Sequence, residues 1–175
     1  RSAVKLMKQR NNFVELINNY LSDVFKGLSG RDEILKLVYK PSITTNNFQE
    51  SEILLQLKKN FTRDLQYGFA VTGPHRDEYH LLLDEKKDRD YFSQGEFRIT
   101  NLSLIMTINR LLSERYSFSP VMIFDDLFSE LDEEIVESVF KYFLNLKNQI
   151  FITSTSEPIK ASLGKQLQVV AGQLV

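Results

Sequence analysis

The stretch Val121-Met122-Ile123-Phe124-Asp125-Asp126 decides the fold class of this 175-residue chain. Four apolar residues with no charge between them are typical of a strand that is covered on both faces, and two carboxylates follow at its end. In open α/β sheets this is the edge where ligands bind. Since successive residues of a strand face opposite ways, one acid can hold a hydrated magnesium ion and the other can hold the water that attacks a γ-phosphate.

Asp125 and Asp126 also have a simpler interpretation, as solvated turn acids that cap a helix. For an isolated Asp-Asp pair that interpretation would be favoured. Here the apolar strand before the pair and the run Ser129-Glu130-Leu131-Asp132 after it favour a site for magnesium and nucleotide.

Ser93-Gln94-Gly95-Glu96, further upstream, opens a long helical pattern. A helix N-terminus can hold a phosphate, and a glycine such as Gly95 lets a backbone approach a ligand closely. Ser93 can equally be an ordinary N-cap, and Glu96 is fully explained as an acid that suits the helix dipole. The signal from this turn alone is therefore weak.

A phosphate loop of the form G-x-x-x-x-G-K-[ST] is absent from the sequence. Gly164-Lys165 resembles its end, but Gln166 follows where Ser or Thr should hold magnesium, and Ile159 stands at the position of the first glycine. The sequence therefore predicts only half of a nucleotide site.

The turn Gly73-Pro74-His75-Arg76-Asp77 presents a histidine and an arginine together. Both His75 and Arg76 could meet phosphate, from a nucleotide or from DNA, but most surface turns of this kind hold no ligand. Basic residues also gather in the first part of the chain. Most suit solvated faces, and DNA contact is the sharper alternative: Lys5, Lys8, Arg10, Lys26, Arg31, Lys36, Lys40, Lys58, Lys59 and Arg63.

Composition places the chain among ordinary globular proteins, with 42% hydrophobic and 26% charged residues. A net charge of −1 gives no overall attraction to nucleic acid. The absence of cysteine excludes disulfides and thiolate metal sites and suits a reducing compartment. No apolar run approaches the ~20 residues of a membrane span, so we expect a cytoplasmic protein without a membrane partner. Because Arg1 already lies in a helical pattern, we also expect a fragment of something longer.

Residue spacing predicts two lobes. In the first, residues 1–67, apolar spacing predicts one helix from Val4 to Leu28, a strand over 35–40 and a helix over 53–65. In the second, residues 68–175, short apolar runs alternate with helical segments, as in a βα-layered sheet. Its expected strands are 69–71, 79–83, a segment reaching Tyr91-Phe92, 121–124, 149–152 and the pair 166–170 with 173–175. Its expected helices cover 96–114 and begin near 132, and a charged turn covers 85–88.

These motifs together resemble the RecF family, within the ABC and chromosome-maintenance class of ATPases. The resemblance covers nearly the whole chain, as the C-terminal half of the family's length. Short motifs carry it: Leu28-Ser29-Gly30, Arg63-Asp64, Gly73 to Asp77, Ser93-Gln94-Gly95, Phe124-Asp125-Asp126, Ser129 to Asp132 and Phe151-Ile152-Thr153. It implies an α/β fold. Residues 68–175 would form the C-terminal half of an ABC-type ATPase head, a P-loop NTPase-like sheet with flanking helices, and residues 1–67 a helical arm lobe associated with gripping DNA.

The resemblance also implies roles for single residues. Asp125 matches the Walker B magnesium ligand, and Asp126 the catalytic position, where most ABC proteins carry glutamate. The signature motif, which contacts ATP held by the Walker A loop of the opposite subunit, would be Ser93, Gln94, Gly95 and Glu96. The D-loop, which communicates across the dimer, would include Ser129, Glu130 and Asp132. Ser154 stands where many ABC ATPases have a switch histidine, and Thr155 is a substitute candidate.

The implied function is that of a DNA-binding ATPase of recombinational DNA repair. It would close as an ATP-dependent dimeric clamp on gapped DNA or on junctions of single- and double-stranded DNA, together with recombination mediator proteins. ATP and Mg²⁺ are the implied cofactors of the full-length protein. Because this chain lacks the Walker A half, we expect it alone to bind ATP weakly or not at all and not to hydrolyse it. The alternative is a non-catalytic interaction module with an ATPase-like fold.

Overall fold

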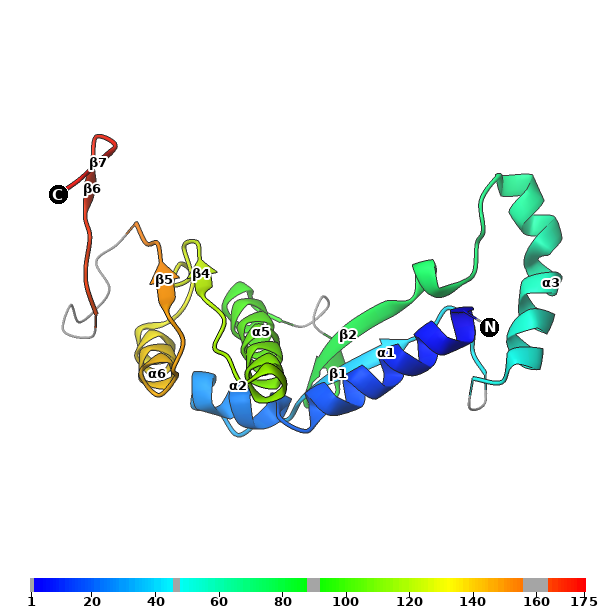
Figure 1. Ribbon diagram of the computed structural model, residues 1–175, viewed down its shortest axis with the longest axis horizontal. Coiled ribbons are helices and arrows are strands. Elements are labelled where there is room, and N and C mark those ends of the chain that lie inside the picture. Colours follow the sequence, from blue (N-terminus) through cyan, green and yellow to red (C-terminus); the bar gives the residue numbers. More distant parts are fainter. Residues whose placement is uncertain (1, 46–47, 88–91, 156–163) are drawn as a thin grey trace. The chain divides into compact units, whose positions relative to one another are not determined.

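The computed structural model describes residues 2–45, 48–87, 92–155 and 164–175 (Figure 1). It divides into two compact units, one of Arg1–Ser22 with Glu33–Phe92 and one of Asp23–Asp32 with Ser93–Val175. These units do not follow the division expected after residue 67. The reason is that strand β1 (Leu35–Lys40) pairs along its whole length with strand β2 (Glu78–Leu83), which lies beyond that boundary.

The first unit is built on this antiparallel pair, with helix α1 (Ser2–Asn18) along β1 (Figure 1). The alternation expected in β1 is confirmed, because Leu35, Leu37 and Tyr39 are buried and the lysines between and after them are exposed. The side-chain amide of Asn18 makes two hydrogen bonds of 2.8 Å with the main chain of Leu37. The end of the helix thereby holds the free edge of the strand.

The single helix expected over Val4–Leu28 is wrong in one respect, since it is two helices, α1 and α2 (Leu21–Ser29). Asn19 and Tyr20 form a turn between them. Asn18 is engaged with Leu37, and the Ser22 hydroxyl donates to the carbonyl of Leu35 at 2.9 Å. These long-range bonds hold both helix ends to β1 and explain the break, which apolar spacing alone does not reveal.

Helix α3 (Glu50–Tyr67) confirms the second expected helix and ends at Gly68, whose φ is +72°. A small core of Met7, Ile43 and Ile53 lies where α1 and α3 meet. The η1 turn (Pro74–Arg76) then leads into β2.

Two expectations for the following segment are wrong. Residues 69–71 form bends and not a strand, because the Asp64 carboxylate takes the N–H of Val71 at 2.8 Å. The charged turn consists of Asp84 and Glu85, both with positive φ, and Lys86–Lys87 already pair as strand β3. The expected strand over 79–83 is confirmed as β2, whereas Asp88 and Tyr91 lie outside the described residues.

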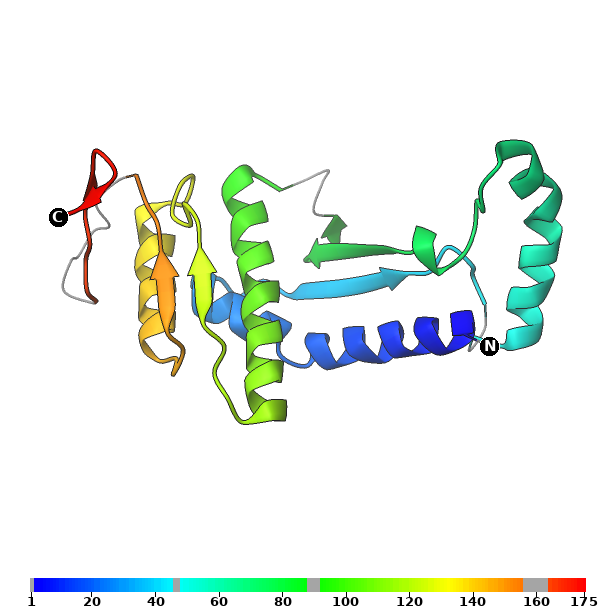
Figure 2. The same ribbon diagram turned by 45° about the horizontal axis from the view of Figure 1, so that its top comes forward.

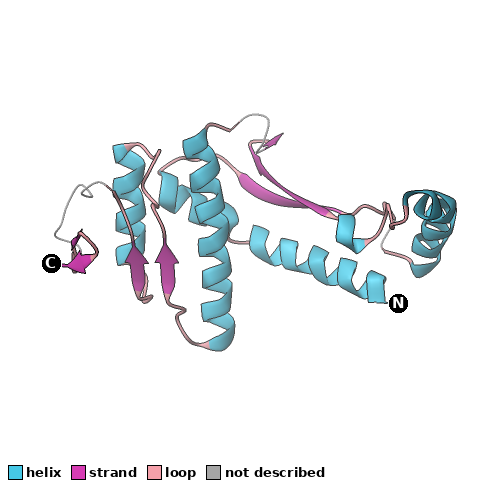
Figure 3. Ribbon diagram, turned by 90° about the horizontal axis from the view of Figure 1, so that it is seen from above, coloured by secondary structure: helices cyan, strands magenta, loops and turns pink. Residues whose placement is uncertain are grey.

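The second unit confirms the order of helices and strands expected after residue 95. It contains helix α5 (Gln94–Tyr116), strand β4 (Met122–Phe124), helix α6 (Glu133–Leu144), strand β5 (Ile150–Ile152) and the short pair β6 (Val169–Val170) and β7 (Gln173–Leu174). Strands β4 and β5 are parallel neighbours, with Ile123 opposite Phe151 (Figures 2 and 3). The rings of Phe124 and Phe143 stack with centroids 5.5 Å apart, which fixes β4 to α6.

Only one face of this two-stranded sheet is covered within the described part of the chain. Ile123 is 75% exposed and Phe151 is 50% exposed, whereas Met122 is buried. The expectation of strands covered on both faces is therefore not met here. The physical reason is that α6 packs on one face only, so every second side chain of β4 and β5 points away from it.

Within the described ranges, no helix has both the length and the apolar character that a membrane crossing requires.

Candidate functional site

Thr153 joins the ends of the two parallel strands. Its hydroxyl donates to Asp125 Oδ1 at 2.5 Å and accepts the main-chain N–H of Asp126 at 3.0 Å. Its own N–H donates to the carbonyl of Phe124 at 2.9 Å. The two acids thus lie at the carboxyl end of β4, where the sequence places them, and the strand beside β4 holds them there.

Asp126 is held in a conformation that residues other than glycine rarely adopt, with φ at +48°. Its carbonyl accepts from Arg98 Nη1 at 2.9 Å and from the N–H of Ser129 at 3.4 Å. Its N–H is engaged by Thr153. Strained backbone persists only where its surroundings determine it, and it gathers at functional sites. Hydrogen bonds to both its N–H and its carbonyl therefore fix the backbone conformation of Asp126.

The Ser93 turn is a capping box. Ser93 Oγ accepts the N–H of Glu96 at 3.2 Å, and the Glu96 carboxylate accepts the N–H of Ser93 at 3.0 Å. Glu96 also pairs with Arg31 at 3.1 Å. The hydrogen bond from the Ser93 main chain, and then the one from Arg31, hold the pKa of Glu96 below its ordinary value. Ser93 and Gln94 remain exposed.

Gly95 is explained by the chain's own backbone. A Cβ on Gly95 would lie 2.9 Å from the carbonyl oxygen of Glu130, a distance that real Cβ atoms do not reach. The sequence motif predicts that this glycine lets a ligand approach the backbone. The contact given by the structure is with the segment Ser129 to Asp132, which approaches Gly95 directly.

Arg98 is a residue of this site that the sequence did not reveal. Its Nε donates to Glu130 at 3.0 Å while its Nη1 donates to the carbonyl of Asp126. One guanidinium on α5 therefore ties the turn after β4 to the helix that Ser93 caps. A lone arginine in a helical pattern carries no signal of this kind, because its partners are distant in sequence.

The residues expected for the D-loop and the switch lie around the two acids and beyond β5. The Ser129 hydroxyl donates to the Asp126 carbonyl at 3.3 Å. Asp132 occupies the N-cap position of α6, but its side chain makes no capping hydrogen bond. Ser154 and Thr155 are exposed beyond β5. Thr153, one residue before Ser154, reaches both acids with its hydroxyl.

In the first unit, the turn from Gly73 to Asp77 is held by Asp77, whose carboxylate accepts hydrogen bonds from Arg10 and Tyr39. The ring of His75 contacts the Ala70 carbonyl at 3.0 Å, and the guanidinium of Arg76 lies over the ring of Phe69 at 5.1 Å. Both side chains are exposed. A contact of His75 or Arg76 with phosphate or DNA stays a prediction.

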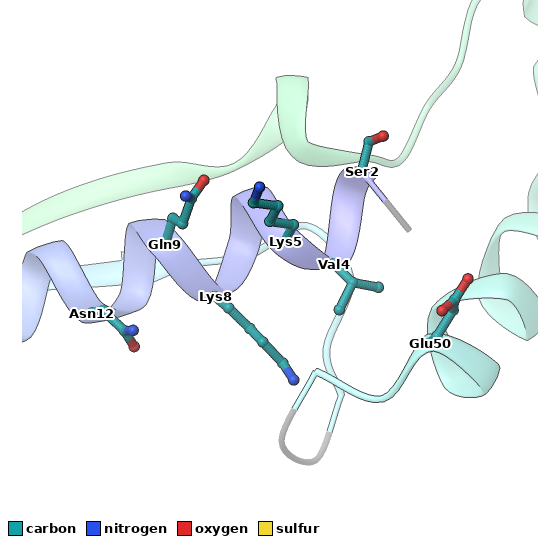
Figure 4. A pocket seen from close by; sticks show the side chains of 7 residues that line it. All are labelled: Ser2, Val4, Lys5, Lys8, Gln9, Asn12 and Glu50. Carbon is teal, nitrogen blue, oxygen red and sulfur yellow. The ribbon is translucent and has the colours of Figure 1, made fainter.

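A shallow hollow of about 520 Å³ lies on α1 near the first turn of α3 (Figure 4). Lys5 and Lys8 line it, together with Glu50 of α3. Among the other basic residues of the sequence analysis, Arg10, Lys26 and Arg31 already pair with carboxylates. The charge of this lining is therefore mixed, and a contact of its lysines with DNA stays a prediction.

Asp125 suits a magnesium ion that other ligands complete. One carboxylate oxygen is engaged by Thr153, and the other makes no hydrogen bond to a described residue. No group of three or more His, Cys, Asp or Glu side chains lies close enough for a metal, as far as the described residues go. Magnesium in phosphoryl-transfer sites uses one or two carboxylates together with waters and substrate phosphates. The single carboxylate of Asp125 is compatible with such a site, and magnesium binding by Asp125 stays a prediction.

Comparison with known proteins adds sequence relatives. No family model matches the chain. It is 31% identical over 159 residues to the DNA replication and repair protein RecF of Lactobacillus johnsonii, covering 87% of this chain and 42% of that protein. It is 28% identical over 172 residues to RecF of Lachnospira eligens, covering 97% of this chain and 46% of that protein. The chain thus spans less than half the length of these relatives.

Solved structures agree with the sequence relatives. The structure described as the recombination mediator protein RecF-ATPrS in the RecFOR pathway superposes with a TM-score of 0.75 and 25% identity over 98% of this chain and 46% of that one. A structure from work on the ATP-driven dimerization of SMC ATPases shares the fold alone, with a TM-score of 0.59 and 16% identity over 97% of this chain and 86% of that one. The α/β fold is therefore that of RecF and SMC ATPase heads. In sequence and in fold, the chain is related to the C-terminal part of the RecF proteins.

Proposed function

We propose that this chain is the part of a RecF-type DNA repair ATPase that carries the signature turn, the acids that serve magnesium and water, and the D-loop. The observation that carries the proposal is the pair Asp125 and Asp126, held by Thr153 at the end of a parallel strand. The relationship to RecF proteins supports it independently.

In this proposal the two acids divide the work. Asp125 binds Mg²⁺, which neutralises the charge of the β- and γ-phosphates of ATP. Asp126 orients the attacking water, and its fixed backbone keeps its carboxylate in place. The ordering of both groups before ATP arrives is what makes positioning effective in phosphoryl transfer.

The Ser93 turn serves ATP bound to a second subunit. The Ser93 hydroxyl accepts a hydrogen bond within the capping box, so its own hydrogen is available to donate to a phosphate. The first N–H groups of α5 and the helix dipole add to this anion site. Gln94 and Gly95 bring their backbone to the same ligand, with Glu96 holding the cap closed.

The full-length protein then closes as a dimer on ATP and clamps single- and double-stranded DNA at gaps or junctions. Recombination mediator proteins act with it in the cytoplasm. The D-loop residues Ser129, Glu130 and Asp132 couple the two sites, and Ser154 or Thr155 senses the γ-phosphate. His75, Arg76 and the lysines of α1 and α3 are the DNA contacts of this proposal. Since the phosphate loop is not in this chain, the chain alone does not hydrolyse ATP.

The substitution Asp126→Asn tests the catalytic role of Asp126. It is made in a full-length protein in which the N-terminal half of RecF precedes this chain. We expect ATP turnover to fall by about a hundredfold, as for loss of a general base, with an unchanged circular dichroism spectrum. Glu133→Gln, an exposed acid in the first turn of α6, is the matched control and should keep turnover.

A non-catalytic interaction module is the second candidate. The capping box favours it, because the box accounts for Ser93 and Glu96 without any ligand. Unchanged turnover in Asp126→Asn would support this candidate and remove the ATPase assignment from Asp126.

A further inference from the structure

We infer that Thr153 is a positioning residue, whose hydroxyl sets the direction of the Asp125 carboxylate toward a metal ion and holds Asp126 in its left-handed conformation. The inference rests on the proposed function, since it concerns the same acids. It assigns a role to a hydroxyl that lies one residue before the expected switch residues.

The contact with Asp125 fixes one of the two carboxylate oxygens. The hydroxyl of Thr153 donates to Oδ1 at 2.5 Å, which engages this oxygen within the protein. A carboxylate at an exposed strand end would otherwise turn among several rotamers. With Oδ1 engaged, Oδ2 makes no hydrogen bond to a described residue and is the oxygen that we assign to a metal ion.

The contact with Asp126 acts on the backbone. The same hydroxyl oxygen accepts the N–H of Asp126 at 3.0 Å, next to a φ of +48°. Without this acceptor, the N–H of Asp126 has no hydrogen-bond partner among the described residues. Only the Asp126 carbonyl then stays engaged, by Arg98 and Ser129. The hydroxyl thus uses its donor on one acid and an acceptor position on the other.

Thr153 itself is rigid. Its N–H is bonded to the Phe124 carbonyl at 2.9 Å, which continues the ladder of β4 and β5. A β-branched side chain has few χ1 choices, so the hydroxyl has little freedom to leave both acids. Thr153 is also exposed, so its role is not to fill a core. Removal of its hydroxyl should leave the fold intact.

Binding of Mn²⁺ alone to the 175-residue chain tests the inference, because Mn²⁺ replaces Mg²⁺ at oxygen ligands and broadens the NMR signals of nearby nuclei. Wild type is compared with Thr153→Val, which keeps the shape and removes the hydroxyl, and with Thr153→Ser, which keeps the hydroxyl. Amide exchange of Asp126 is followed in the same samples, and thermal unfolding shows that each variant is folded.

We expect Mn²⁺ to broaden the signals of Asp125 and Asp126 in wild type. Thr153→Val should weaken this binding by about tenfold, the usual cost of losing a group that orients a metal ligand, and should speed the amide exchange of Asp126. Thr153→Ser should restore both properties.

Equal Mn²⁺ affinity in Thr153→Val and wild type would overturn the inference. So would the absence of Mn²⁺ broadening at Asp125 in wild type, since no metal would then be positioned. The proposed ATPase function is judged separately, by the turnover of Asp126→Asn in the full-length protein. If Asp126→Asn loses turnover but Thr153→Val keeps the Mn²⁺ affinity of wild type, the role of Thr153 is removed and the proposed ATPase function stands.

Discussion

The Arg10 guanidinium on α1 donates to the carboxylate of Asp77 at 2.7 Å, and the Asp77 side chain is completely buried. The Tyr39 hydroxyl and the N–H of Ser42 donate to the same carboxylate. Burial, and then the bond to Asp77, raises the pKa of Tyr39. Asp77 therefore links a helix, a strand and a loop of the first unit, and this explains why the turn from Gly73 ends in an acid.

Asp77→Asn should destabilise the first unit by about 2 kcal/mol, the cost of removing a charged hydrogen-bond partner. The loss is moderated because the Arg10 side chain is 27% exposed and can regain water. Urea unfolding of both variants measures it. Asp32→Asn is the control, since Asp32 pairs with Lys26 at the surface with 85% exposure. Equal stability of Asp77→Asn and wild type would remove Asp77 from this role.

Gly95→Ala should destabilise the second unit by about 2 kcal/mol, because the added methyl group must displace the backbone carbonyl of Glu130. Gly164→Ala is the matched control, since nothing lies within 4 Å of a Cβ there. Thermal unfolding compares the two. If both variants unfold at the same temperature as wild type, the close approach of Gly95 and Glu130 does not exist in solution.

Glu96→Gln should remove the part of the pH dependence of the free energy of unfolding that comes from the Glu96 carboxylate. The pKa of Glu96 is lowered in the folded state, so its contribution is complete above its ordinary value of 4.5 and is lost as the pH falls through the folded value. Glutamine still accepts the N–H of Ser93 but pairs more weakly with Arg31. At pH 7 wild type should be more stable by about 0.5 kcal/mol, and the difference should vanish in acid. Urea midpoints at both pH values measure it, and a difference that grows in acid would contradict the assignment.

Arg98 and Glu130 should show a coupling energy in a double-mutant cycle with alanine. We expect about 0.5 to 1 kcal/mol, because the guanidinium is also fixed by the Asp126 carbonyl. Lys141 and Glu137, an exposed pair within α6, should couple less strongly. A larger coupling in the Lys141 pair would show that the second contact of Arg98 does not strengthen its pairing with Glu130.

The sequence reveals the elements that depend on local pattern. The alternation of Leu35, Leu37 and Tyr39 predicts β1, and the apolar run ending at Phe124 predicts β4. Both strands occur where expected. Their residues carry the signal themselves, since the period of side chains along a strand is fixed by its geometry.

The wrong expectations concern contacts between distant residues. The helix break at Asn19 and Tyr20 follows from bonds between Asn18 and Leu37 and between Ser22 and Leu35. The missing strand at 69–71 follows from the Asp64 side chain, which takes the N–H of Val71. No local propensity contains such information.

The candidate site shows the same limit. The acids and the Ser93 turn are visible as motifs, but Thr153 and Arg98 acquire their roles only when β5 and α5 approach the turn after β4. Many sequences have a threonine after an apolar run or an arginine in a helix. The structure is therefore needed to identify the partners of Thr153 and Arg98. The acid pair indicates the chemistry, and its supporting residues come from the fold.

Titration calorimetry of ATP in the presence of Mg²⁺ tests the central claim most directly, which is that this chain carries the signature and acid half of a nucleotide site whose phosphate loop lies elsewhere. The 175-residue chain is compared with the full-length protein in which it follows the N-terminal half of RecF. We predict no saturable heat from the chain alone and saturable binding by the full-length protein. Micromolar affinity of the chain alone would contradict the claim.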